Sequence, residues 1–268
     1  MSDLAEFMKE CNRTLLTETD REVSTVKEYL VDERKLLEKS WKSHTIGYCR
    51  IGCKLPDPVR FYGTSEKPEE KWDISRYVQG KIIVPVFSEF GEIIAFASRS
   101  PTSAPGNSWW NLPSPFKKGN HLYLLDKARK SIYEKNKVYI VEGYMDALVL
   151  FQYGLKNVVA LMGTAFTLRK ISLIARYCNN VCLCFDTDAN ESGDKGKKIA
   201  ITMLKKYDFC EDISTIKLPL KVDPDIFVSK EGLNAFLALE KVLTQSEINK
   251  LCKEVVKEKT AKEILYAQ

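Results

Sequence analysis

The sequence has only two histidines among its 268 residues, and it contains no apolar run long enough to cross a membrane. Residues 1–22 also lack the continuous apolar core of a secretory signal peptide. These absences favour a cytoplasmic protein without a membrane partner. The apolar share of 44% and the charged share of 29% are ordinary for a soluble globular chain.

Two common ligand-binding loops are also missing. Gly193 and Gly196 lack the spacing to a Lys-Ser or Lys-Thr pair that a Walker phosphate-binding loop requires. An EF-hand beginning at Asp186 would need glycine where Glu191 stands and glutamate where Lys197 stands. Both kinds of site are therefore excluded.

The eight cysteines do not indicate a disulfide framework, because the chain is large and has no secretion signal. Cys182 and Cys184 lie within an apolar run and are most simply core residues. His44, Cys49 and Cys53 are three possible metal ligands. A structural zinc site needs four ligands at recurrent spacings, however, and no second cysteine pair follows. We therefore expect that these three residues do not bind a metal.

Short apolar runs alternate with helical patterns between residues 137 and 198. The β-prone runs are 138–141, 158–161 and 181–185, and helical patterns follow at 145–153 and 168–177. The runs are apolar throughout, which is typical of parallel strands with both faces covered by helices. The sequence therefore predicts an α/β fold with a parallel, Rossmann-like sheet.

Acidic residues stand where two of these runs stop. Glu142 follows the first run, with Asp146 in the next helical turn, and Asp186 and Asp188 follow the third. Ligands of such sheets bind at the carboxyl ends of the strands. If the first and third strands are neighbours, four carboxylates face one crevice.

Electrostatics then predicts a cation. Two carboxylates about 4 Å apart repel by roughly 4 kcal/mol at an effective dielectric near 20. Oxygen ligands without nearby His or Cys suit Mg²⁺ or Mn²⁺, which can act in pairs in phosphoryl transfer. Alone, Glu142 is better explained as a helix-start acid, and Asp186 with Asp188 can be an ordinary polar turn. The combination supports the metal site.

That combination, with Gly163-Thr164 between the two acidic strand ends, resembles the Toprim domain. The wider match is to bacterial DnaG-type primases and covers residues 23–243. It rests on the following segments: 141–146, 161–165, 184–188, 223–225 and 228–232. The resemblance implies that Asp223 and Asp225 form a further pair of metal or nucleotide-phosphate ligands.

The resemblance implies a DNA primase, which synthesises short RNA primers on single-stranded DNA from ribonucleoside triphosphates by two-metal nucleotidyl transfer. The implied catalytic residues are Glu142, Asp186 and Asp188. The implied ligands of Mg²⁺ or Mn²⁺ are Glu142, Asp146, Asp186, Asp188, Asp223 and Asp225. The implied contacts to nucleotide or nucleic acid are Arg99, Trp109, Asn111, Lys118 and Lys195. Trp109 and Trp110 are explained either by stacking on bases or by packing.

The resemblance also predicts the domain organisation. An N-terminal arm, 1–22, is expected to be a loosely attached helix, and a mixed α+β subdomain follows at 23–130 with a hairpin at 81–97. The Toprim domain is expected at 131–228. The remaining residues are expected to form C-terminal helices, at 233–243 and 246–265.

The sequence departs from the family pattern at Phe87, Ser88 and Ser108, where the family commonly has basic or acidic residues. These departures keep one alternative open, a non-catalytic relic that binds single-stranded DNA. A Toprim-type nuclease, which would use the same metals for cleavage, is a second alternative that no specific feature supports. The family's zinc-binding and helicase-binding domains are not visible in the sequence. A separate zinc-domain protein and a replicative helicase are therefore expected partners, as in a phage or mobile-element replication system.

Overall fold

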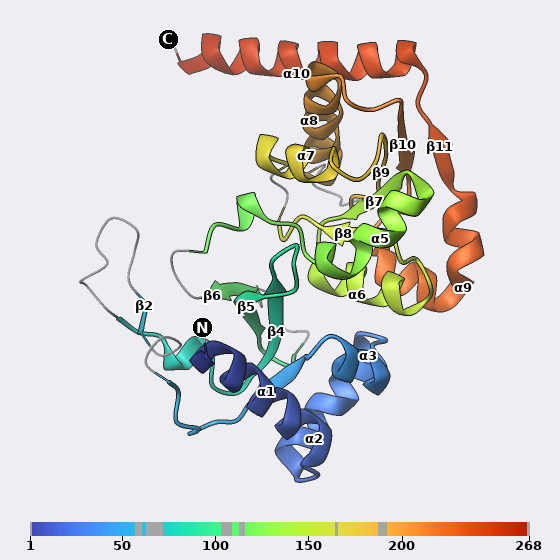
Figure 1. The fold of residues 1–268 in the computed structure, drawn as a ribbon. Coiled ribbons are helices and arrows are strands. Elements are labelled where there is room, and N and C mark those ends of the chain that lie inside the picture. The colour runs from blue at the N-terminus through green and yellow to red at the C-terminus, as the bar shows by residue number, and fades with distance from the viewer. Residues whose placement is uncertain are drawn as a thin grey trace. The chain divides into compact units, whose positions relative to one another are not determined.

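The computed structural model describes residues 2–56, 61–62, 72–102, 109–112, 116–163, 166–186 and 192–266. The chain divides into two compact units, Met1–Lys118 and Gly119–Gln268 (Figure 1). Within the described ranges, no helix has both the length and the apolar character of a membrane span.

The first unit is built on an antiparallel sheet with the strand order β1-β4-β5-β6. Its strands are β1 (Gly47–Cys49), β4 (Lys81–Phe87), β5 (Ile93–Arg99) and β6 (Trp110–Leu112), and a separate pair comprises β2 (Phe61–Tyr62) and β3 (Trp72–Asp73). Its helices are α1 (Ser2–Thr17), α2 (Arg21–Glu28), the π-helical turn η1 (Tyr29–Glu33), α3 (Glu38–Ser43) and the short η2 (Ser75–Tyr77). The predicted hairpin is confirmed as β4 and β5.

Helix α1 is part of the core of this unit. Met8 and Leu15 are completely buried. Strand β1 approaches the helix so closely that a Cβ atom at Gly47 would lie 2.4 Å from the backbone carbon of Cys11. The helix was predicted correctly, but the prediction of loose attachment is wrong, because the apolar side chains of α1 pack on the sheet.

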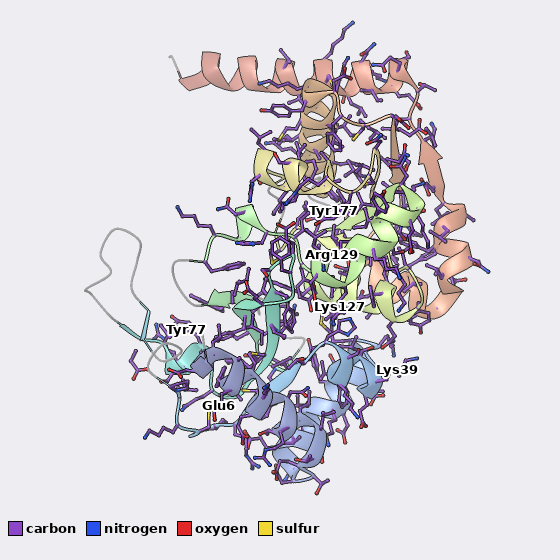
Figure 2. The ribbon with its side chains drawn as sticks, viewed as in Figure 1. Glu6, Lys39, Tyr77, Lys127, Arg129 and Tyr177 are labelled. Atoms are coloured by element: carbon purple, nitrogen blue, oxygen red, sulfur yellow. The ribbon has the colours of Figure 1, made fainter. Side chains whose placement is uncertain are left out.

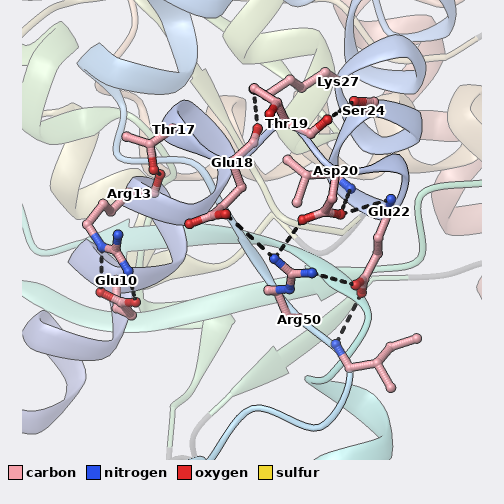
Figure 3. Close-up of polar contacts among 12 residues, drawn as sticks. Glu10, Arg13, Thr17, Glu18, Thr19, Asp20, Glu22, Ser24, Lys27 and Arg50 are labelled. Atoms are coloured by element: carbon pink, nitrogen blue, oxygen red, sulfur yellow. Dashed lines mark hydrogen bonds and ion pairs between the residues drawn. The ribbon is translucent and has the colours of Figure 1, made fainter.

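The connection between α1 and α2 is fixed to the chain that follows β1 (Figure 3). The Arg50 guanidinium lies 2.7 Å from Oδ2 of Asp20 and 3.5 Å from Oε2 of Glu22. Asp20 also caps α2 by accepting the backbone N–H of Glu22. The N–H of Ile51 and the hydroxyl of Tyr48 both donate to Glu22 Oε1. The turn after β1 is therefore held by a polar network.

The second unit is built on a five-stranded sheet with the order β11-β10-β9-β7-β8. Its parallel strands are β7 (Lys137–Val141), β8 (Val158–Ala160), β9 (Asn180–Leu183) and β10 (Asp212–Ile216), and β11 (Glu240–Val242) pairs antiparallel at the edge. This confirms the predicted parallel sheet. It also makes the first and third strands of the sequence pattern, β7 and β9, direct neighbours.

Helices cover this sheet. They are α5 (Leu125–Lys135), α6 (Tyr144–Gln152), α7 (Leu168–Ile174), α8 (Ser192–Tyr207), α9 (Pro224–Ala238) and α10 (Gln245–Tyr266), with the short η3 (Lys118–Asn120) before them. Alternate residues of β7 and β9 share one apolar core with α5, α7 and α8. Tyr177 packs at the edge of this core (Figure 2). Helix α10 crosses α8 (Figure 1), and α6 packs on β8 and α9.

The prediction of a helix at 233–243 is wrong in its second half. Helix α9 already begins at Pro224 and is interrupted at Gly232, which has φ 84°. Residues 240–242 form the edge strand β11. The physical reason is the side chain of Glu240, which accepts the Tyr139 hydroxyl at 2.7 Å and the Ser214 hydroxyl at 2.5 Å and pairs with Lys137.

Candidate active site

Glu142 and Asp186 lie at the same end of neighbouring parallel strands. Glu142 follows β7 directly and precedes Gly143, the N-cap residue of α6. The backbone N–H of Cys184 donates to the carbonyl of Ile140 at 2.8 Å, so the pairing of β7 with β9 continues beyond Leu183. Asp186 follows two residues later. The condition for the predicted crevice, that the first and third strands are neighbours, is therefore met, and the gathering of four carboxylates stays a prediction.

These two carboxylates are half-buried. Oε1 of Glu142 and Oδ1 of Asp186 are the buried oxygen atoms. Removing a carboxylate from water is costly unless donors or cations compensate for it. The oxygen donors at this edge match the ligands that Mg²⁺ and Mn²⁺ prefer, so the residues fit such an ion.

Asp146 and Asp225 form a second, deeper pair. They are 7% and 0% exposed, respectively. Oδ1 of Asp146 accepts the backbone N–H of Asp225 at 3.4 Å, and Oδ1 of Asp225 accepts the N–H of Ile226 at 2.7 Å. Each residue lies in the first turn of its helix, α6 or α9, where the positive end of the helix dipole stabilises negative charge.

Gly143 leaves room for Asp146. A Cβ atom at position 143 would lie 2.5 Å from Oδ2 of Asp146, closer than any side chain permits. The glycine between Glu142 and Asp146 therefore leaves room for the Asp146 carboxylate beside the backbone of residue 143. The sequence contained this glycine as part of the motif but gave no indication of this contact.

The other predicted acids are not brought into this pair. Asp223 is the exposed N-cap residue of α9, two positions before Asp225. Asp188 lies outside the described residues. In the part of the chain that the structure describes, no three His, Cys, Asp or Glu side chains gather closely enough to hold a metal ion. This also applies to His44, Cys49 and Cys53, all of which are described.

A buried ammonium group, absent from the sequence-based site, lies at the same edge of the sheet. Lys170 is 1% exposed, and its Nζ donates to the carbonyl of Leu161 at 2.6 Å. The N–H of Leu161 in turn donates to Val141, the residue before Glu142. Lys170 stands three residues before Leu173, so helical spacing on a buried face was the signal that could have located it.

The candidate nucleic-acid residues of the first unit surround the end of β5. The Arg99 guanidinium lies 5.6 Å from the centre of the Trp109 ring. Trp110 is 48% exposed, and its ring stacks on Tyr77 with 4.0 Å between the ring centres. Trp110 therefore packs against Tyr77 while remaining open to solvent, and its stacking on a base stays a prediction.

The other residues predicted to contact nucleotide or nucleic acid are Asn111, Lys118 and Lys195. Asn111 pairs through its backbone with Ala97 of β5, and its side chain and Ser108 lie outside the described part. Lys118 is exposed at the end of the first unit. Lys195 is exposed in the first turns of α8 in the second unit. Their contacts with nucleotide or nucleic acid stay predictions.

Comparisons with known proteins agree with this architecture. Residues 139–228 match the Toprim-like family. The chain is 39% identical over 164 residues to a DNA primase of Clostridium acetobutylicum, covering 60% of this chain and 26% of the relative. It is 34% identical over 226 residues to the Escherichia coli K12 DNA primase, covering 76% and 38%. The chain thus spans well under half the length of these relatives.

Solved primase structures share the fold over nearly the whole chain. A DnaG primase catalytic domain bound to single-stranded DNA superimposes with a TM-score of 0.72 at 26% identity, covering 92% of this chain and 83% of the other. The zinc-binding and RNA polymerase domains of Aquifex aeolicus primase give 0.69 at 26% identity, with 96% and 66% covered. Both units therefore have counterparts in one known architecture.

Proposed function

We propose, from the premise that this chain is a DnaG-type primase catalytic core with a Toprim domain, that it synthesises short RNA primers on single-stranded DNA. The substrates would be ribonucleoside triphosphates. The observation that carries this proposal is the position of Glu142 and Asp186 at adjacent carboxyl ends of β7 and β9, inside a fold shared with primase catalytic domains. The chain spans well under half the length of its relatives, so the proposal concerns the polymerising step alone.

Within this proposal, the acidic edge holds the cofactor, Mg²⁺ or Mn²⁺. Such ions neutralise phosphate charge and favour attack by a 3′-hydroxyl in nucleotidyl transfer. Glu142 acts closest to the reacting atoms, with Asp186 and Asp188 as principal ligands. Asp146 and Asp225, already oriented by two helix N-termini, form a second set with Asp223.

The proposed template and nucleotide contacts are those on exposed or aromatic positions. Arg99 beside Trp109 offers a positive charge next to an aromatic face, a combination that binds single strands with little sequence preference. Asn111, Lys118 and Lys195 complete the proposed contacts. A structure of a related catalytic domain bound to single-stranded DNA supports this substrate class.

Primer synthesis on mixed single-stranded DNA with labelled ribonucleotides and Mg²⁺ or Mn²⁺ tests the proposal. We expect products from the native chain and at least a hundredfold loss in Glu142→Gln and Asp186→Asn, on the order of a lost transition-state electrostatic contact. The matched control is Asp212→Asn, an exposed acid at the opposite, amino end of the sheet. Unchanged circular dichroism would show that each variant is folded.

The outcomes separate the alternative functions. Full activity in Asp186→Asn would overturn the site assignment. Metal-dependent cleavage of DNA without synthesis would indicate a Toprim-type nuclease. Metal-independent binding of single-stranded DNA, with neither activity, would indicate a non-catalytic relic.

We also propose a zinc-binding domain and a replicative helicase as partners of this core. The Aquifex aeolicus structure, which combines zinc-binding and RNA polymerase domains, supports the first partner. The second rests on the sequence resemblance alone. Primer yield should rise at least several-fold when either partner is added, and no change with any tested helicase or zinc domain would contradict this proposal.

A further inference from the structure

Three cysteines meet in the core of the first unit. The Sγ atoms of Cys49 and Cys53 are 2.9 Å apart. Cys11 on α1 belongs to the same buried cluster as Cys49. Cys11 and Cys49 are 4% and 1% exposed, whereas Cys53 is only half-buried. The cluster therefore has one thiol near solvent and a second thiol directly behind it.

The turn that joins Cys49 to Cys53 holds the two thiols together. The backbone N–H of Cys53 approaches the carbonyl of Arg50 at 3.4 Å, and Gly52 adopts the left-handed conformation with φ 77° that this reversal needs. Arg50 is anchored by its ion pair with Asp20 (Figure 3). The Gln79 side-chain amide donates to the carbonyl of Cys53 at 2.7 Å. These contacts fix the backbone of the turn that carries Cys49 and Cys53.

A surface hollow lies beside the chain that follows Cys53. It lies between α1 and the residues after Cys53, with Glu6, Phe7, Lys54 and Leu55 among its lining residues. Glu6 projects from α1 in Figure 2. Phe7 and Leu55 belong to the same apolar cluster as Cys49, and Cys53 packs against that cluster. Cys53 itself is half-buried, so an oxidant can reach the pair at this residue.

We propose that Cys49 and Cys53 form a reversible disulfide with hydrogen peroxide as the oxidant. The Cys53 sulfur attacks the peroxide, giving a sulfenic acid and one water molecule. The Cys49 sulfur then attacks the Cys53 sulfur, which forms the S–S bond and releases a second water molecule. Two thiols and one peroxide thus give one disulfide and two waters, and a thiol reductant reverses the change.

The distances favour this bond over other products. A disulfide bond is about 2.05 Å long, so the two sulfur atoms need to approach by less than about 1 Å from their 2.9 Å separation. The neighbouring thiol and burial raise the pKa of Cys53, so little thiolate is present at neutral pH and the attack on peroxide is slow. The adjacent Cys49 thiol, and not a low pKa of Cys53, therefore directs the oxidation toward a disulfide.

Peptide mapping of the native chain tests the proposal directly. Trypsin cuts after Lys42, Arg50 and Lys54, so it separates Cys49, in peptide 43–50, from Cys53, in peptide 51–54. After peroxide treatment and alkylation of free thiols, we expect these two peptides to be joined, and dithiothreitol to separate them. Cys53→Ser should abolish the joined product, whereas Cys210→Ser, a half-buried cysteine of the second unit, should leave it intact.

Three results would overturn the proposal. One is a Cys53 peptide that carries sulfinic acid and no link. Another is a product that joins peptide 43–50 to the Cys11 peptide, 10–13, instead. The third is stoichiometric zinc that protects both thiols in the native chain. Because mass spectrometry reads the bond itself, the result is independent of primer synthesis.

Discussion

Oδ2 of Asp146 lies in the space that a side chain at Gly143 would occupy, 2.5 Å from an ideal Cβ atom. Gly143 has φ −101° and ψ 156°, which any residue can adopt, so the requirement for glycine comes from the carboxylate and not from the backbone. In the Glu142-Gly143-x-x-Asp146 motif, the glycine therefore provides the space that the Asp146 carboxylate occupies.

Gly143→Ala should therefore move the Asp146 carboxylate away from its contact with Asp225. We expect a loss of about 1–3 kcal/mol in the free energy of unfolding, as for other overpacked sites, together with reduced primer synthesis. Urea denaturation followed by circular dichroism measures the first effect. In an Asp146→Ala background the same substitution should cost less than half as much, and equal costs in both backgrounds would contradict the assigned clash.

Gly47→Ala should destabilise the first unit. The added Cβ atom would lie 2.4 Å from the backbone carbon of Cys11 and 2.5 Å from the backbone nitrogen of Asn12. Backbone atoms cannot rotate away, so we expect a loss at or above the upper end of about 1–3 kcal/mol in urea unfolding. Gly119→Ala is the matched control, because its φ is not positive and the added Cβ atom would lie at an ordinary contact distance of 3.4 Å from Cγ2 of Thr167. A Gly47→Ala variant as stable as this control would show that α1 is not packed as described.

Lys170→Met should leave the carbonyl of Leu161 without its ammonium donor inside the core. The methionine retains most of the apolar volume, so the loss should come from the polar contact, about 1–3 kcal/mol in the free energy of unfolding. Arg169→Met, at an exposed position of the same helix, should change stability by less than about 0.5 kcal/mol. Equal stability of the two variants in urea would argue against a stabilising role for the buried ammonium.

The sequence was sufficient to predict the parallel strands and the acids at their ends. Continuous apolar runs such as Val138–Val141 are best explained as buried parallel strands when helical patterns follow them. The ends of these strands then locate Glu142 and Asp186. The neighbouring positions of β7 and β9 did not follow from these runs, because strand order depends on long-range pairing.

What the sequence missed is determined by tertiary contacts. Residues 240–242 have no strong strand signal, and they form an edge strand because Glu240 binds side chains from β7 and β10. Helical spacing places Lys170 on the buried face of its helix, but its charge favours solvent, and the Leu161 carbonyl that accepts its Nζ–H explains the burial. Met8 and Leu15 are isolated apolar residues in a polar stretch, and they are buried because β1 packs on α1.

The pH dependence of stability should reveal the Glu240 network. Burial pushes the pKa of Glu240 upward, but hydrogen bonds from Lys137, Ser214 and Tyr139 outweigh it and hold the pKa below its usual value. A carboxyl group whose pKa is lower in the folded state stabilises the protein above its unfolded pKa, about 4.3. That contribution is lost as the pH falls through the lower, folded pKa.

Glu240→Gln lacks this charge at every pH. We therefore expect it to be less stable than the native chain by about 2 kcal/mol at pH near 7, as for a buried charged hydrogen-bond acceptor, with the difference shrinking as the pH falls below about 4. Urea unfolding of both proteins across this range measures the difference. Glu134→Gln, an exposed acid 3.8 Å from Lys130, should show almost no difference at either end. A gap between Glu240→Gln and the native chain that stays constant with pH would mean that the carboxylate charge does not stabilise β11.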